Sequence, residues 1–147
     1  MELCENTLDV LRNFSSINQN IMIRSGNNIK TMSVTRNMIA TADVSEQFTK
    51  DFGIYDLNEF IGVLGLVDTP NLTFEDDFVI VQDSTGRSTI KYFYSAEETL
   101  TTATKDVKMP EADCMFTLDN STLNKLKKAA ATLGHKEVSI QAKDGVL

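Results

Sequence analysis

The spacing of apolar residues predicts three short amphipathic helices. In residues 56–67, positions i, i+3, i+4 and i+7 form one apolar face, made of Leu57, Phe60, Ile61 and Leu64. Asp56 is placed as the N-cap, with Glu59 three residues later as in a capping box. Similar faces predict helices over 6–16 and from 120 or 121 to 133, with Gly134 ending the last.

The opposite face of the 56–67 helix is small and uncharged. It carries Asn58, Gly62 and Gly65, although a glycine in an exposed helix costs about 1 kcal/mol relative to alanine. One explanation is that the two glycines allow another helix to pack closely against this face.

Each helix is followed by segments with strand and turn signals, so the chain repeats one βα-type unit. The first copy has a strand at 21–23, a hairpin turn at 25–28 and return strands at 29–34 and 38–44. The second has a strand at 72–74, a turn at 75–78 and return strands at 78–83 and 88–95. The third has a strand at 137–143 and a hairpin signal at Asp144-Gly145.

This repetition predicts an α+β fold with the helices on one side of antiparallel sheet. We expect residues 1–110 to form one complete domain, ending in a connector at about 95–112, and residues 111–147 to begin a second. The third unit has no return strand, so the chain is expected to be C-terminally truncated; the alternative is a natural short tail.

Charge is unevenly distributed along the chain. The formal net charge is −7, but residues 1–110 carry 9 basic and 16 acidic residues, whereas 111–147 carry 5 of each. Between Ser121 and Lys136 there are four lysines and no acidic residue. At 100° per residue, Lys128 lies opposite the apolar stripe of that helix. Lys125 flanks the position of Lys128, and Lys127 lies nearer the edge of the stripe. The alternative interpretation is that these lysines form an ordinary solvent-exposed helix face with no binding role.

Candidate chemistry is sparse. Two cysteines and one histidine provide neither a disulfide framework nor a metal-ligand set. No P-loop, GxSxG or HExxH pattern is present, so we expect no enzyme activity, no cofactor and no metal. No apolar run approaches the ~20 residues of a membrane span, and the N-terminus does not resemble a signal peptide. An intracellular protein without a membrane partner is expected.

Several phrases, in order and at similar spacing, resemble the sliding clamps of T-even-type bacteriophages, the DNA polymerase processivity factors: LRNFSSIN, IMIRSGN, FGIYDLNEFIGVLGLV and RSTIKYF. The resemblance runs through the whole chain, which would be about two-thirds of a clamp subunit. It implies a head-to-tail ring of three subunits whose helices line a hole for duplex DNA. It also implies that a clamp loader opens the ring and that a replicative polymerase attaches by a peptide, in the cytoplasm of an infected bacterium.

The resemblance turns charged positions into candidate sites. Arg12, Lys125, Lys127 and Lys128 would face DNA, and Arg24, beside the predicted hairpin turn, could touch it at a ring face. Val107, Met109 and Pro110 could rim the peptide pocket; alternatively they pack on their own sheet. An incomplete chain would not close a three-subunit ring and could instead pair with another copy through residues 137–147.

A second reading of the chain has no DNA role. It is a small intracellular α+β module whose partner docks on sheet edges. The orientation of the helices separates the two hypotheses, because only a clamp needs its helices to present one common side.

Overall fold

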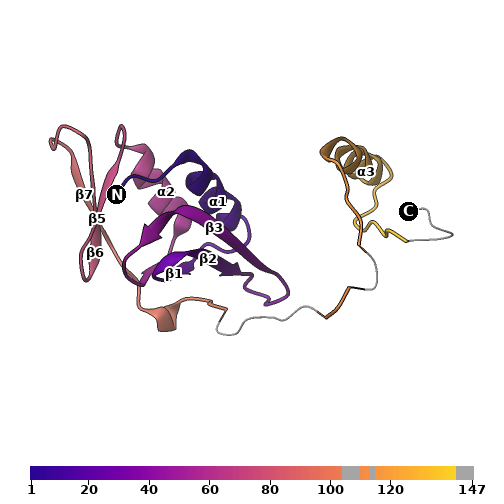
Figure 1. Cartoon of the computed structure of the whole chain (residues 1–147), viewed down its shortest axis with the longest axis horizontal. Helices are drawn as coiled ribbons and strands as arrows, with labels where there is room; N and C mark the ends of the chain where they lie inside the picture. Colours follow the sequence, from indigo (N-terminus) through magenta and orange to yellow (C-terminus); the bar gives the residue numbers. More distant parts are fainter. Residues whose placement is uncertain (104–109, 113–114, 142–147) are drawn as a thin grey trace. The chain divides into compact units, whose positions relative to one another are not determined.

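The computed structural model describes residues 1–103, 110–112 and 115–141, and it divides into two compact units, Met1–Asp106 and Val107–Leu147. The first unit is α+β with antiparallel sheets, as predicted (Figure 1). Its helices are α1 (Glu5–Ser15), α2 (Leu57–Gly65) and the short 3₁₀ helix η1 (Glu97–Thr99). The only helix described in the second unit is α3 (Asn120–Thr132). Thus the three predicted helices are present.

The strands of the first unit form three antiparallel groups. β1 (Ile21–Ile23) pairs with β4 (Phe52–Ile54), and β2 (Gly26–Met32) pairs with β3 (Ile39–Phe48). A meander follows, in which β6 (Phe78–Gln82) lies between β5 (Asn71–Phe74) and β7 (Thr89–Phe93). The predicted turn at 75–78 is where β5 meets β6, closed by a bond from the Glu75 N–H to the Phe78 carbonyl at 2.9 Å.

The predicted hairpin turn at 25–28 is wrong. β1 does not fold back on β2 but pairs with β4, since these two short strands are apolar and supply four buried side chains to the core: Ile21, Ile23, Phe52 and Ile54. The hairpin instead joins β2 to β3 through residues 33–38, where Arg36 adopts a φ of 57°. The Ser-Gly-Asn-Asn signal marks the entry to β2, at which Gly26 has a φ of 116°.

The core lies between the two helices and the strands. Leu11 and Phe14 of α1 and Leu57, Phe60 and Leu64 of α2 are buried in it, and α1 contacts both α2 and β3. Figure 1 shows α1 and α2 side by side. Both helices therefore bury one apolar face in the same core, which leaves their opposite faces on the outside.

A carboxylate from β3 closes the start of α1. Glu46 accepts hydrogen bonds from the backbone N–H of Cys4 and from the hydroxyl of Thr7. Burial raises the pKa of the Glu46 carboxyl, but the bonds from Thr7 and Cys4 outweigh burial and lower the pKa overall. The ionised side chain thus replaces a local cap at the positive end of the helix dipole.

Residues 95–101, expected to belong to a connector, are attached to the first unit. The Ser95 N–H donates to the Gly53 carbonyl at 3.0 Å, and the Thr101 N–H donates to Asn20 Oδ1 at 2.8 Å. The start of the connector therefore extends the β1–β4 layer before the chain continues to the second unit.

The second unit lacks the strand predicted at 137–143 over its described part. Residues 137–141 are irregular, and the side chains of Val138 and Ile140 are 54% and 44% exposed. A strand needs a hydrogen-bonding neighbour, and none lies among residues 115–141. The turn predicted at Asp144-Gly145 lies outside the described residues.

Candidate nucleic-acid interface

We call the residues on the side of a helix opposite its apolar face the outward stripe. In α2 this stripe is Asn58, Gly62 and Gly65, and all three are exposed. A Cβ placed on either glycine would meet no atom within 4 Å. Close packing of another helix is therefore not what these glycines provide within the described structure.

The sequence of α2 explains why this side is held outward. Asp56 Oδ1 accepts the N–H groups of Asn58 and Glu59 at 2.9 and 3.0 Å, which fixes the first turn as predicted. Phe60 is 2% exposed and packs on the Tyr92 ring at 5.1 Å. With one face fixed in the core, the glycine-bearing face must remain open.

The outward stripe of α1 is Glu5, Asp9 and Arg12. Arg12 points away from the buried side, but its Nη1 lies 2.8 Å from Glu5 Oε1 and 2.8 Å from Asp9 Oδ1. Hydrogen bonds with Glu5 and then Asp9 raise the pKa of the guanidinium. Two carboxylates and one guanidinium give this stripe a net charge of −1.

The α3 helix has well-defined ends. Asp119 Oδ1 accepts the Thr122 N–H at 2.8 Å, and Gly134, with a φ of 70°, ends the helix as predicted. The N–H groups of His135 and Gly134 donate to the carbonyls of Ala130 and Ala131, which is the Schellman arrangement. These local signals fix the helix, and with it the direction of its lysines.

The outward stripe of α3 is Ser121, Lys125, Lys128 and Thr132, with a net charge of +2. Lys125, Lys127 and Lys128 are all exposed. Within the described residues none of the three is paired with a carboxylate. This stripe differs from that of α1, where every charge is engaged.

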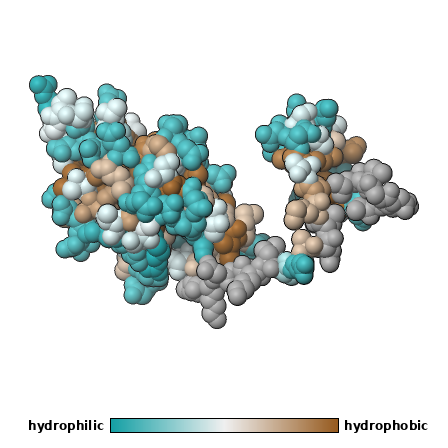
Figure 2. All heavy atoms as spheres, in the orientation of Figure 1, coloured by the Kyte–Doolittle hydropathy of each residue, from teal (hydrophilic) through white to brown (hydrophobic). Residues whose placement is uncertain are grey.

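In the described part of the second unit, the apolar face of α3 reaches the surface. No residue of the helix is buried, and Leu123 and Leu133 are 43% and 70% exposed. Figure 2 shows apolar atoms reaching the surface beside the polar atoms of α3. Leu126 and Ala130 are half-buried, so the predicted apolar stripe is present in the helix but only partly covered by the described residues.

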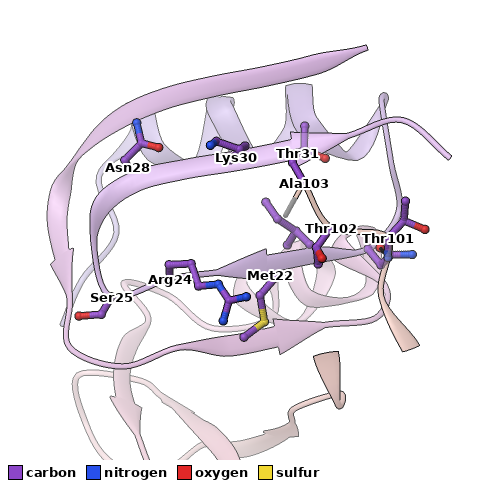
Figure 3. A pocket seen from close by; sticks show the side chains of 11 residues that line it. Met22, Arg24, Ser25, Asn28, Lys30, Thr31, Thr101, Thr102 and Ala103 are labelled. Atoms are coloured by element: carbon purple, nitrogen blue, oxygen red, sulfur yellow. Dashed lines mark hydrogen bonds between the residues drawn. The ribbon is translucent and has the colours of Figure 1, made fainter. Parts of the chain in front are cut away.

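Arg24 lies at the end of β1 and bridges two acidic residues. Its guanidinium lies 2.8 Å from Asp51 Oδ2 and also pairs with Glu97 of η1. Hydrogen bonds with Asp51 and then Glu97 raise its pKa. It lines a polar pocket of about 240 Å³ between β1, β2 and residues 101–103 (Figure 3). Arg24 thus ties the connector to the first unit.

The sequence indicated that Asp9 lies close to Arg12, but it did not reveal the other carboxylates that occupy the two arginines. Glu5 lies seven residues before Arg12 on one helical stripe, so helical spacing alone could have found that pair. Asp51 and Glu97 are brought to Arg24 by the β1–β4 pairing and by η1, and nothing local in the sequence indicates them. Of the expected pocket rim, Pro110 is exposed, while Val107 and Met109 lie outside the described residues.

Other classes of site are not indicated by the described residues. No group of three or more His, Cys, Asp or Glu side chains in them could hold a metal ion. Among the helices of the described part, none has the length and apolar character that crossing a membrane requires.

These features are those of an α+β protein of the clamp type, with amphipathic helices that each present one side outward and with unpaired cations, among the described helices, on α3. The model of one family, described as DNA polymerase processivity factor, matches residues 5–102. The chain belongs to the DNA polymerase processivity factor family.

The relatives agree with this assignment. The chain is 34% identical to the "Sliding clamp" of Vibrio phage KVP40, over 99% of this chain and 66% of that protein. It is 32% and 30% identical to the proteins named "Sliding clamp" in Enterobacteria phage T4 and Escherichia phage RB69, over 99% of this chain and 64% of each relative. The chain thus spans about two-thirds of the length of these relatives. The alternative of an interaction module without a DNA role is not favoured by these matches.

Proposed function

We propose that this chain is part of a sliding clamp that encircles duplex DNA and tethers a replicative polymerase. The observation that carries the proposal is the outward stripe of α3 in a member of the processivity factor family: its Lys125 and Lys128 have no carboxylate partner in the part of the chain that the structure describes. The acidic total of the chain does not oppose this role, because contact depends on where charge lies rather than on its sum.

The proposed mechanism is electrostatic and does not read sequence. Lysine contacts with phosphates release counterions, and such contacts position a protein on DNA without selecting bases. Few contacts of this kind allow the protein to slide. Processivity then comes from enclosure of the duplex rather than from affinity, and the protein performs no catalysis and needs no cofactor.

Within this proposal the candidate residues contribute unequally. Lys125 and Lys128 make the principal contacts, and Lys127, nearer the apolar side of α3, supports them. Arg12 and Arg24 contribute less, since each is already engaged by two carboxylates.

The proposed partners follow from the resemblance to clamps. They are duplex DNA, the polymerase, a clamp loader and further copies in a head-to-tail trimer, in the cytoplasm of an infected bacterium. Val107, Met109 and Pro110 are proposed to rim the pocket for the polymerase peptide. Pairing of two copies of this chain through residues 137–147 remains part of the proposal.

The test is the salt dependence of binding to a short fluorescent duplex, measured by anisotropy. Replacing Lys125 and Lys128 by glutamine should reduce the slope of log K against log salt by roughly 1.8, since each phosphate contact adds about 0.9. The control, Lys50→Gln with Arg87→Gln, makes the same change in net charge at two positions of the first unit that lie outside α1, α2, η1 and α3. Equal effects of the two double variants would overturn the proposal.

A further inference from the structure

The first unit contains a cation that its own helix neutralises. Arg12 lies on the outward stripe of α1, and its side chain is 49% exposed. Both Glu5 and Asp9 bind the same nitrogen, Nη1. On the neighbouring α2, the corresponding stripe of Asn58, Gly62 and Gly65 has no charge. The outward sides of these two packed helices therefore offer no net positive charge.

We infer that Glu5 and Asp9 mask Arg12, so that α1 holds a latent phosphate-binding group and the electrostatic grip on the duplex rests on α3. This inference depends on the proposed function. It assigns to two carboxylates the role of weakening DNA contact in the first unit.

The geometry supports masking rather than simple crowding of charge. Positions 5, 9 and 12 follow i, i+4 and i+7, so the three side chains lie along one line on the helix. Both carboxylates are bound to Nη1, so a phosphate that approaches the other guanidinium nitrogens of Arg12 meets two negative charges within a few bonds' reach and is repelled by both. Because all three side chains are exposed, water can replace the lost bonds, and removal of the acids should leave the arginine free rather than buried.

The chemistry of a mobile clamp gives this arrangement a purpose. Each additional phosphate contact strengthens binding and steepens its dependence on salt. A masked arginine keeps the number of phosphate contacts low, while the exposed side of α1 still carries charged side chains. Glu5 in the first turn and Arg12 in the last turn also match the helix dipole, so the same three residues stabilise the helix.

The experiment uses the whole chain and four variants in the anisotropy assay. Glu5→Gln with Asp9→Asn should tighten binding several-fold, up to roughly tenfold at about 50 mM salt, and increase the salt slope by about 0.9. Adding Arg12→Gln to that pair should remove the gain in slope. Arg12→Gln alone should change the slope little. The control pair, Asp77→Asn with Glu98→Gln, raises the net charge equally at two exposed sites away from α1.

Three results would overturn the inference: no gain from the Glu5 and Asp9 replacements, a gain that persists without Arg12, or an equal gain from the control pair. The Lys125 and Lys128 replacements report separately on the proposed function. If they reduce the slope while the α1 variants do nothing, DNA binding stands and masking fails. Circular dichroism of each variant checks that α1 remains folded.

Discussion

Replacing Gly53 by alanine tests how the connector is joined to the first unit. Gly53 lies in the middle of β4 and is buried, and its carbonyl accepts the Ser95 N–H at 3.0 Å. A Cβ on this residue would lie 2.4 Å from the Ser95 carbonyl oxygen and 2.7 Å from Leu100 Cδ1. The side chain of Leu100 can rotate away, but the Ser95 carbonyl is part of the backbone, so the whole segment around Ser95 must move.

The cost can be worked from these distances. An ordinary carbon–oxygen contact is about 3.3–3.6 Å, so the segment at Ser95 must retreat by about 1 Å. Overpacking of this kind costs about 1–3 kcal/mol, and weakening the Ser95–Gly53 bond adds about 0.5–1.5 kcal/mol. Loss of glycine's extra freedom in the unfolded chain returns about 0.5–1 kcal/mol. The net expectation is a destabilisation of about 0.5–4 kcal/mol, centred near 2.

Gly62→Ala is the matched control, because it makes the same chemical change with the opposite expected sign. Gly62 is inside α2, exposed, and a Cβ there meets nothing within 4 Å. Alanine should therefore stabilise the helix by about 0.5–1 kcal/mol.

Urea unfolding followed by far-UV circular dichroism measures both variants. Thermal unfolding is a second measurement of the same change: in a domain of about 100 residues, each kcal/mol of stability corresponds to a shift of at least about 4 °C in the thermal midpoint. We expect Gly53→Ala to unfold at lower urea than the parent and Gly62→Ala at higher urea. An unchanged midpoint for Gly53→Ala would refute the claimed contact with Ser95, and a loss at Gly62 would show that its outer face is covered.

Three further changes probe the core and the helix ends, each read by urea unfolding. Phe60→Ala removes a 2%-exposed ring packed on Tyr92 and should cost about 3–5 kcal/mol. Asp56→Ala removes both bonds to the start of α2 and should cost about 0.5–2 kcal/mol. Glu46 has a lowered pKa in the folded state, so its stabilisation is present above its unfolded pKa and is lost as pH falls through the folded value. The stability difference between the parent and Glu46→Gln should therefore shrink on acidification; a difference independent of pH would contradict the bond to Thr7.

Local signals in the sequence predicted the helices well. Asp56 caps α2 and Gly134 ends α3 because each acts on backbone groups within a few residues of itself. The apolar spacing likewise places Leu57 and Phe60 in the core. Where a feature depends on four or five consecutive residues, the sequence contains most of the information needed.

Pairing between distant segments could not be predicted in this way. The turn residues at 25–28 favoured a hairpin, but β1 and β4, about 30 positions apart, share the buried centre of the fold. The same non-local pairing brings Asp51 towards Arg24 and removes that arginine from the set of available cations. A strand at 137–143 was predicted from the repeated order of helix, strand and turn, yet residues 137–141 have no pairing partner among the residues that the structure describes.

If the proposed function is right, the distribution of charge explains how an acidic protein would hold a polyanion. At physiological ionic strength the screening length is about 8 Å, so carboxylates on remote faces act weakly on a duplex that lies against one helix. What such a duplex meets is the nearest stripe: net −1 on α1, uncharged on α2 and +2 on α3. Under the proposed function, contact is then confined to α3, where Lys125 and Lys128 have no carboxylate partner among the described residues. Salt that screens the distant acids also screens these lysines, so affinity alone cannot keep the protein on DNA for long. Retention by enclosure, as proposed, is the arrangement for which such a weak and local grip is sufficient.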